Sequence, residues 1–532
     1  MNNWKCKLKN KLQVFEFKYI FKLFMPLFIQ TFTLALVLFI GSLATTFYKR
    51  VYHVDGSYNG YYFYAISKIL TVYKITTFVP IIYQLGVIVI ASNLYGQEKH
   101  QEINKLIHSS IYISLLLNLF IYLIMAVLAP TILEAAGSKN NAIYSWISKD
   151  GYETFQNNLK IAKFNSIDTK ENINTIVNGG VINGTHFSST YPLVLEKNEL
   201  LFTVNFLRLT MLDLFAFSIG QILIAALQAI KKNKYSMIAV IASILSRIIW
   251  TYSILFIPKS TNLMLLVSLE TLIGGLIQTI VAYIFVYKYL FNKFKIHFKN
   301  SWNSKYIKEI FKIGLPIAIE SGIWYVSQYM IARAIPFSGL NDHFIGIYRS
   351  INNLYDIFAS FALALSYITS AIVAQEIGKH DYERAYKMGN ATKKLAIYGQ
   401  LIMSLISIIL TYPLLKIFAI DSKLINKIGY ILMFLMMIKS LADIGNLTTL
   451  RALWGVNNVL TPIWISLLSM IALQLSSTYL ISIFLYKNNQ RLTAESFFIL
   501  LYASTILDQL VRSTLYGLRW KSKTWIKYAK AL

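Results

Sequence analysis

The feature that most constrains this chain is a series of long apolar blocks separated by polar segments. About twelve blocks reach the roughly 20 residues that a helix needs to cross the hydrocarbon core of a bilayer. We place these spans at 23–47, 64–92, 108–134, 202–229, 235–257, 263–291, 311–335, 344–374, 395–419, 428–454, 459–486 and 496–519. The sequence therefore predicts an all-α polytopic protein of the cell membrane, with twelve transmembrane helices.

The composition excludes several other classes of protein. Only 14% of the 532 residues are charged, against about 25% in soluble globular proteins, which excludes a soluble enzyme and a disordered chain. Cys6 is the only cysteine, so disulfides and multi-cysteine metal sites are excluded. The sequence has no G-x-x-x-x-G-K-[ST] phosphate loop, and its histidines lie in predicted loops or at span ends. We expect no metal and no cofactor, apart from a transported coupling ion.

Basic residues are concentrated on one side of the predicted membrane. They lie before the first span, in alternate loops and after the last span, namely at Lys5–Lys22, Lys231–Lys234, Lys288–Lys312, Lys379–Lys394 and Arg519–Lys530. Because cytoplasmic loops are enriched in Lys and Arg, we expect both termini in the cytoplasm. The net charge of +27 then attracts anionic membrane lipids. Nucleic acid is not an expected partner, since the charges are scattered over many loops.

Two segments outside the regular spans need separate treatment. A basic stretch precedes the first block, but the apolar run is longer than the 7–15 residues of a signal-peptide core, so we expect a retained span. The long polar segment 138–199 is expected outside the cell. Its Asn178-Gly179 and Asn183-Gly184 pairs indicate turns.

The two halves of the chain repeat each other. Similar residues recur at corresponding places, namely Pro26 and Pro316 (290 apart), Gly96 and Gly378 (282 apart), Pro130 and Pro413 (283 apart), and Leu227-Gln228-Ala229 and Leu450-Arg451-Ala452 (223 apart). The drop in separation is close to the length of the segment 138–199, so one insertion in the first half accounts for it. Six spans per half give the two copies the same orientation in the membrane.

This repeat divides the chain into two pseudo-symmetric six-helix bundles. We expect a cytoplasmic N-terminal segment 1–22, an N-lobe 23–291 with the extracellular insertion 138–199, a cytoplasmic linker 292–310, a C-lobe 311–519 and a cytoplasmic tail 520–532. Two similar bundles that face each other leave a central cleft, and rocking one against the other gives alternating access. The repeat therefore indicates a transporter.

Several motifs resemble those of the MATE (multidrug and toxic compound extrusion) family. They are the Pro-opened first and seventh spans, Ala371–Gly378 leading into Glu383-Arg384-Ala385, and Leu450–Gly455 followed by Pro462. The resemblance covers nearly the whole chain except 138–199. It implies two six-helix lobes and export of organic, often cationic, compounds in exchange for Na⁺ or H⁺. The same superfamily includes flippases of lipid-linked sugars, so the fold does not decide the cargo.

Acidic residues inside the predicted C-lobe spans are candidates for cation coupling. A charge at mid-bilayer costs at least about 2.5–3.5 kcal/mol, so each needs a partner or a function. Glu320, Asp356 and Asp443 are our candidates, and the resemblance supports Glu320 and Asp443, because family members often carry acids on spans seven and ten. The alternative is a structural ion pair, such as Asp443 with Lys439. For Asp508 we favour such a pair, with Arg512.

The first half departs from the family pattern. Many members have an acid late in span one and another in span five, whereas span five here contains Arg247 and no acid. Lys74 enters span two, Asp213 lies in span four and Glu270 in span six, and we expect Lys74 to pair with Asp213 or Glu270. Because a buried Lys or Arg could be the counter-charge of a cargo, an anionic or zwitterionic cargo remains an alternative.

Aromatic and amide side chains near the acids are candidates for lining the substrate cavity. Trp324, Tyr325 and Tyr329 lie along span seven and could form an aromatic surface for organic cations, although packing or interfacial roles are the simpler interpretation. Asn352, Asn353 and Tyr355 flank Asp356, and Asn446 follows Asp443. These groups could complete the coordination shell of a cation.

Three functions are consistent with this sequence. The first is a monomeric secondary antiporter that exports small organic compounds and is coupled to Na⁺ or H⁺. The second is a lipid or lipid-linked saccharide flippase, which Lys74 and Arg247 would suit. The third is a membrane-embedded enzyme or passive scaffold, and we find no pair of catalytic residues near one membrane face to support it. We therefore expect a transporter and not an enzyme.

Overall fold

The structure is a computed structural model. It describes residues 18–36, 51–53, 58–59, six residues between 66 and 76, and 78–135, 138, 143–146, 181–182, 185–186, 193–196, 199–256, 262–292, 303–338, 340, 342–417, 425–486 and 493–529. Eleven helical segments in this part of the chain are long and apolar enough to cross a membrane. The more polar helix α12 lies between the sixth and seventh of them in chain order. The twelve predicted spans are thus all represented by helices.

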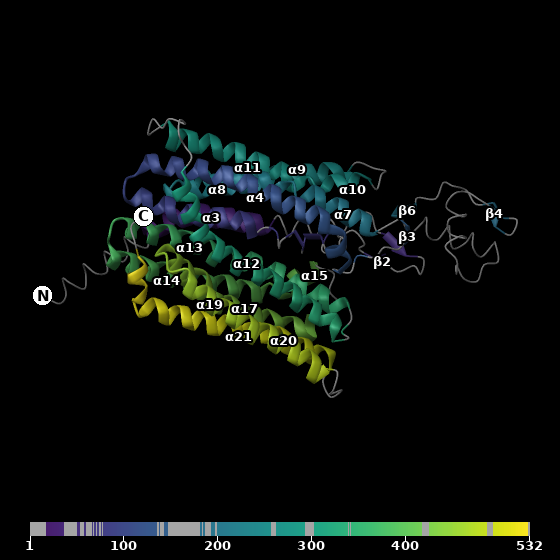
Figure 1. Ribbon diagram of the computed structural model, residues 1–532. Coiled ribbons are helices and arrows are strands. Elements are labelled where there is room, and N and C mark those ends of the chain that lie inside the picture. Colours follow the sequence, from purple (N-terminus) through teal and green to yellow (C-terminus); the bar gives the residue numbers. More distant parts are fainter. Residues whose placement is uncertain are drawn as a thin grey trace.

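The helices of the N-lobe lie together on one side of the molecule (Figure 1). They are α3 (Phe78–Gly96), α4 (His100–Ala135), α7 (Glu199–Thr210), α8 (Asp213–Ala229), α9 (Asn233–Phe256), α10 (Asn262–Val267), α11 (Glu270–Val286) and the π-helical turn η1 (Tyr287–Phe291). The first helix, Lys18–Leu36, belongs to the same half of the sequence but packs against residues of α13 in the other lobe. The fourth and sixth predicted spans are each divided, by the turns at Met211–Leu212 and Ser268–Leu269. Each break leaves an acid, Asp213 or Glu270, at the start of the following helix.

The C-lobe helices form the other half of Figure 1, in green to yellow. They are α12 (Ser304–Phe337), α13 (Asp342–Gly378), α14 (Tyr382–Ile409), α15 (Thr411–Ile417), α17 (Tyr430–Ile444), α18 (Leu450–Gly455), α19 (Leu460–Ser469), α20 (Ser476–Leu480) and α21 (Ala494–Lys521). Spans ten and eleven also contain the π-helical turns η2 (Ile425–Gly429), η3 (Gly445–Thr449), η4 (Met470–Leu475) and η5 (Ile481–Tyr486), and a short 3₁₀ helix, η6 (Thr524–Tyr528), follows α21.

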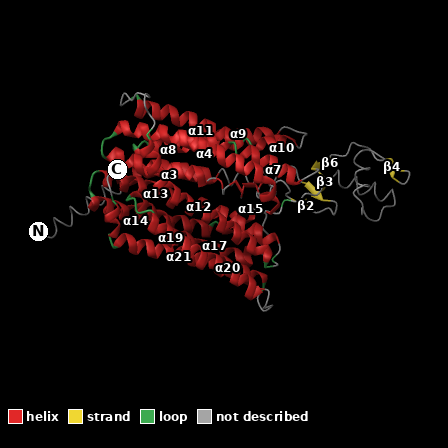
Figure 2. Cartoon of the chain, in the orientation of Figure 1, coloured by secondary structure: helices red, strands yellow, loops and turns green. Residues whose placement is uncertain are grey.

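Short strands add to the predicted all-helical fold at one end of the molecule (Figure 2). β1 (Val51–His53), β2 (Tyr58–Asn59), β3 (Ile143–Trp146) and β6 (Leu193–Glu196) form an antiparallel sheet in the order β2-β1-β3-β6, and β4 (Val181–Ile182) pairs with β5 (Thr185–His186). The insertion is therefore joined to the loop after the first span, through Tyr52 opposite Trp146. This strand pairing could not be predicted from the sequence, because the partners are far apart in the chain.

The predicted repeat is visible in the backbone. The turns after α3 and α13 each contain a residue with φ 62°, Glu98 and His380, which are 282 positions apart. The turns after α8 and α18 contain Lys231 (φ 62°) and Asn457 (φ 64°), which are 226 positions apart. The sequence match at this place, with a separation of 223, is thus displaced by three residues, because a Leu-x-Ala pattern is too short to define a register more finely than about one helical turn.

The two lobes meet at one end, which we call the basic end because its turns contain Lys99, Lys231, Lys232 and Lys379. Here α3 and α13 cross with backbone in contact with backbone. A Cβ atom on Gly96 would lie 2.5 Å from the carbonyl oxygen of Gln375, and one on Gly378 would collide with the carbonyl oxygen of Asn93. Since Asn93 and Gln375 are also 282 positions apart, the two contacts are equivalent under the pseudo-symmetry of the repeat.

Packing beside this crossing follows the same symmetry. In one pair α12 lies along α3, and Gly86 faces Ile310. In the equivalent pair the first helix lies along α13, and the rings of Phe24 and Phe361 are 4.7 Å apart. The side-chain amide of Gln375 also donates to the Ala229 carbonyl, at 2.8 Å. Equivalent contacts of four helices therefore join the two lobes.

Candidate transport site

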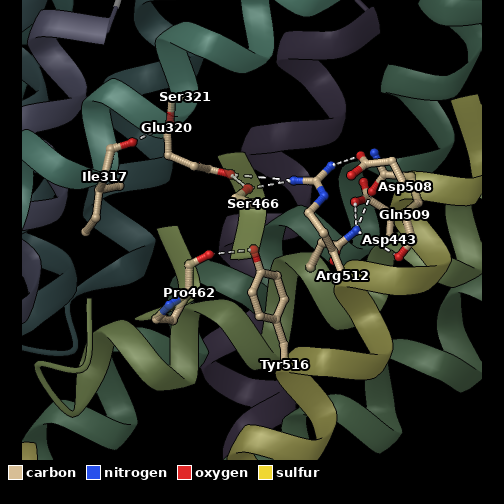
Figure 3. A network of polar contacts seen from close by, with 11 residues as sticks. Ile317, Glu320, Ser321, Asp443, Pro462, Ser466, Asp508, Gln509, Arg512 and Tyr516 are labelled. Atoms are coloured by element: carbon tan, nitrogen blue, oxygen red, sulfur yellow. Dashed lines mark hydrogen bonds and ion pairs between the residues drawn. The ribbon is translucent and has the colours of Figure 1, made fainter. Parts of the chain in front are cut away.

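The most extensive buried polar network of the C-lobe is centred on Arg512 of α21 (Figure 3). Its guanidinium lies 2.6 Å from the Asp508 carboxylate, one turn earlier on the same helix, and 3.6 Å from Glu320 of α12. The side chains of Arg512 and Asp508 are 4% and 0% exposed. Two carboxylates around one cation are thus buried in a region where an uncompensated charge is costly.

Ser466 of α19 links the two sides of this network. Its hydroxyl donates to Glu320 Oε1 at 2.5 Å and accepts from Arg512 Nη1 at 2.9 Å. Glu320 follows Pro316 by about one helical turn, where α12 passes the start of span eleven. The structure therefore places Glu320 in a closed ionic contact, and it pairs Asp508 with Arg512 as the sequence predicted.

Asp443 of α17 forms the second part of the same network. Its carboxylate accepts hydrogen bonds from the Tyr355 hydroxyl of α13 and from Asn446 Nδ2 at 3.2 Å. Gln509 lies between Asp443 and Arg512. In one orientation of its side-chain amide, the nitrogen of Gln509 donates to Asp443 Oδ1 at 2.8 Å and its oxygen accepts from Arg512 at 3.0 Å. Gln509 then connects Asp443 to the ion pairs of Arg512. The structure thus brings the candidates Asp443, Tyr355 and Asn446 together.

Lys439 does not form the ion pair with Asp443 that the sequence suggested. Lys439 is buried, with 3% of its surface exposed. Within the described residues no carboxylate lies within 4.0 Å of its ammonium. It lies instead over the rings of Tyr355 and Tyr502, at 4.9 and 5.7 Å from their centroids. Spacing by one helical turn permits an ion pair but does not require one, because the tyrosine rings offer the lysine a cation–π contact.

The remaining C-lobe candidates lie on α12 and α13. Asp356 is exposed on α13, and Asn352 and Asn353 are half-buried one turn before it. On α12, Trp324 and Tyr325 are half-buried and in contact edge to face, with ring centroids 5.2 Å apart. Tyr329 accepts from Arg333 at 3.4 Å.

The N-lobe contains a separate polar cluster. Arg247 of α9 pairs with Glu270 of α11 at 3.0 Å, and the hydroxyl of Thr251 also donates to Glu270. Asp213, at the start of α8, accepts from the Tyr73 hydroxyl at 2.6 Å. Glu270 thus has Arg247 as its partner, whereas the predicted partner Lys74 lies outside the described residues.

Several residues of these clusters were not predicted from the sequence. Ser466, Gln509 and Tyr502 carry no feature in the sequence that separates them from other polar residues in spans. Tyr73 could have been found, because it lies 282 positions before Tyr355. Within the described residues no group of three or more His, Cys, Asp and Glu side chains is arranged to hold a metal ion.

Two family models match the sequence. The MatE model matches residues 65–149 and 316–480, one segment in each half of the chain, and the model described as a polysaccharide biosynthesis protein matches residues 173–373. An uncharacterized transporter of Bacillus subtilis (strain 168), YisQ, is 21% identical over 265 residues. That match covers 50% of this chain and 56% of the relative, so it spans little more than half of the relative's length.

Solved structures resemble this fold over nearly the full chain. An outward-facing multidrug resistance MATE family transporter of the MOP superfamily has a TM-score of 0.72 at 11% identity, with 97% of both chains covered. A variant of the Vibrio cholerae MATE transporter VcmN has a TM-score of 0.71 at 10% identity, covering 97% of this chain and 99% of that one. A MOP superfamily transporter from Pyrococcus furiosus, described as having a binding pocket of reversed polarity that suggests a different function, has a TM-score of 0.68 at 11% identity and 96% coverage of both.

These likenesses concern the fold, and they agree with the order of helices in both lobes. The MatE model matches one segment in each half of the chain. This agrees with the duplication seen in the positive-φ turns and in the crossing of α3 and α13. The resemblance stated from the motifs is thereby confirmed. This multi-pass membrane protein has the fold of MATE transporters, and both halves of its chain match the MatE family model.

Proposed function

We propose that this protein exports small organic compounds by alternating access, in exchange for Na⁺ or H⁺. The observation that carries the proposal is the symmetric contact at the basic end, where Gly96 meets Gln375 and Gly378 meets Asn93. Two parallel repeats that close at one membrane face and separate at the other expose a site between them to each side in turn. In this proposal the basic end and both termini face the cytoplasm.

The C-lobe network offers a mechanism for coupling. Arg512 and Asp508 belong to one helix, so their 2.6 Å pair moves as a unit. The 3.6 Å pair of Arg512 with Glu320 joins α21 to α12 and breaks when these helices move apart. A Na⁺ ion or a proton that reaches Glu320 or Asp443 then replaces the lost positive neighbour, since carboxylate oxygens bind either. Asp356, exposed on α13, is a further candidate.

The driving force is sufficient for export. One elementary charge that moves down 100 mV releases about 2.3 kcal/mol. At about 1.4 kcal/mol per tenfold concentration ratio, this sustains roughly a 50-fold gradient of a neutral compound.

Proteoliposomes that contain the purified protein test this function. Ethidium flux is measured under an imposed Na⁺ gradient or an imposed pH gradient. We expect one of these gradients to drive flux, and we expect Glu320→Gln and Asp443→Asn to uncouple it. Glu495→Gln is the matched control, because Glu495 pairs with Lys427 at an exposed helix start. Full coupling in both C-lobe variants would contradict the assignment of Glu320 and Asp443.

A second candidate function is flipping of a lipid-linked saccharide or another anionic lipid. It is supported by the match to a polysaccharide biosynthesis model over residues 173–373. Arg451 supports it as well, because this guanidinium lies 5.0 and 4.7 Å from the ring centroids of Tyr367 and Trp454. Its buried Nη1 has no hydrogen-bond partner within the described residues. A fluorescent anionic lipid in the same proteoliposomes separates the two functions. The flippase would be favoured by two results together. The natural protein would move the fluorescent lipid but not ethidium, and Arg451→Gln would abolish the movement of the lipid.

A further inference from the structure

Each lobe contains one buried hydrogen bond between a tyrosine and an aspartate. In the N-lobe the Tyr73 hydroxyl donates to Asp213 Oδ2 at 2.6 Å, and in the C-lobe the Tyr355 hydroxyl donates to Asp443 Oδ2. The two tyrosines are 282 positions apart, the separation that also relates Gly96 to Gly378. The aspartates lie on spans four and ten, which are equivalent in the repeat. The two lobes therefore hold related polar sites.

The two sites differ at the second oxygen of the aspartate. Asp443 Oδ1 accepts from Asn446 at 3.2 Å and, with the amide turned toward it, from Gln509 at 2.8 Å. Asp213 is 4% exposed, and its Oδ1 is buried with no hydrogen-bond partner in the described part of the chain. This oxygen faces Gly275 of α11, where a Cβ atom would collide with it. Because glycine has no side chain, Gly275 leaves space beside Asp213 Oδ1 but offers it no side-chain hydrogen-bond donor.

The charges around Asp213 do not compensate an ionised carboxylate. In the described part of the chain the cation that interacts with Asp213 is Arg247 of α9, and its guanidinium is paired with Glu270 of α11 at 3.0 Å. The described helix α3 contains no Asp, Glu, Lys or Arg, and α4 reaches α8 through Asn118, which donates to the Leu214 carbonyl at 3.0 Å. Among these three described groups, Asp213, Arg247 and Glu270, an ionised Asp213 therefore leaves a net charge of −1, whereas a protonated Asp213 leaves them neutral.

We propose that Asp213 is a proton-binding site of the N-lobe, with Tyr73 as its positioning residue. A proton binds at Oδ1 and converts the carboxylate into a neutral carboxylic acid, and it leaves again to water when the lobe is open to the other side. No other bond forms or breaks. A buried carboxyl without an ion pair favours the neutral form, and this is the chemistry that distinguishes H⁺ from Na⁺, which needs several oxygen ligands. The proposal rests on the transport function above and makes H⁺ the coupling ion.

Infrared difference spectroscopy of the purified protein in lipid tests the site without a transported compound. Exposed Asp and Glu titrate near pH 4, so a carboxylic acid band that is lost between about pH 5.5 and pH 8.5 reports an unusual carboxyl. We expect this band in the natural protein and in Asp443→Asn, and we expect its loss in Asp213→Asn. Tyr73→Phe keeps the carboxyl and should shift the band, because it removes one hydrogen bond. Absence of the band from the natural protein, or its persistence in Asp213→Asn, would overturn the proposal.

Transport measurements distinguish this proposal from the function on which it rests. Ethidium flux driven by a pH gradient in proteoliposomes should be lost in Asp213→Asn, and an imposed Na⁺ gradient should not drive flux in the natural protein. Flux driven by Na⁺ alone would overturn the proton site and leave antiport intact. If neither gradient drives flux, antiport of this probe fails, and the infrared band still decides whether Asp213 binds a proton. The melting temperature of each variant in detergent confirms that it is folded.

Discussion

Addition of one methyl group at Gly96 tests whether the crossing of α3 and α13 closes the basic end. The new Cβ atom of Gly96→Ala would lie 2.5 Å from the Gln375 carbonyl oxygen, where an ordinary contact needs 3.4 Å or more. The two helices must therefore separate by about 1 Å, because both contact surfaces are backbone of rigid helices and neither can rotate away. Gly378→Ala makes the equivalent change on the other helix, against Asn93.

The free-energy cost of this change falls on the closed arrangement alone. Overpacking by a methyl group costs about 1–3 kcal/mol. A conformation with the lobes apart at this end does not pay that cost, so the ratio of open to closed molecules should rise by about 5- to 150-fold. The higher helix propensity of alanine acts equally in both conformations and cancels.

Electron–electron distance measurement between two nitroxide labels detects the shift. Cys6→Ser removes the only native cysteine, and Lys99→Cys with Lys387→Cys places labels on exposed positions beside the two turns. We expect a larger population of long distances in Gly96→Ala and in Gly378→Ala than in the natural background. Gly517→Ala is the matched control, because its Cβ would meet only Lys393 Nζ, at 3.6 Å.

The reasoning would be refuted if both crossing variants kept the distance distribution of the control. In that case the contact of α3 with α13 would not be what closes the basic end. The separation of the lobes would then have to be controlled by the helices that pack beside the crossing.

Three further substitutions test the packing and the charges. Arg512→Met leaves Asp508 buried without its cation and should destabilise the protein by about 3–5 kcal/mol. At about 2.1 cal/mol/K per residue this lowers the melting temperature in detergent by about 3–5 °C, and an unchanged value would contradict the network. Trp525→Ala removes a fully buried ring that stacks on another tryptophan at 4.8 Å, and it should cost about 3–5 kcal/mol in the same assay. Lys427→Met breaks an exposed pair with Glu495, so its melting temperature should change by about 1 °C or less.

The sequence was sufficient for the number of spans and for the duplication. Apolar blocks of bilayer length predict helices, since an unsatisfied backbone group in lipid is so costly that few other structures can cross. The duplication could be read from Gly96 and Gly378 because close approach of two backbones tolerates no side chain, so the residue type itself records the contact. The short Leu-x-Ala match had no such constraint, and its register was displaced by three residues.

The sequence also identified the buried acids, because a carboxyl within an apolar block stands out. It assigned only some of their partners correctly. Asp508 and Arg512 lie on one helix at a spacing that favours pairing, and this pair was predicted correctly. Asp443 and Lys439 have the same spacing, yet Tyr355 and Gln509 from other helices surround Asp443 instead.

What the sequence determined by itself is therefore the content of each membrane span: its length, its polar residues and its place in the repeat. What only the tertiary structure decided is which polar residue of one helix meets which residue of another. Glu320 meets Arg512 and Tyr73 meets Asp213 across 192 and 140 positions of chain. The physical reason is that an apolar helix is equally stable in lipid in many rotations, and only the packing of small residues and the satisfaction of buried charges by neighbouring helices select one of them.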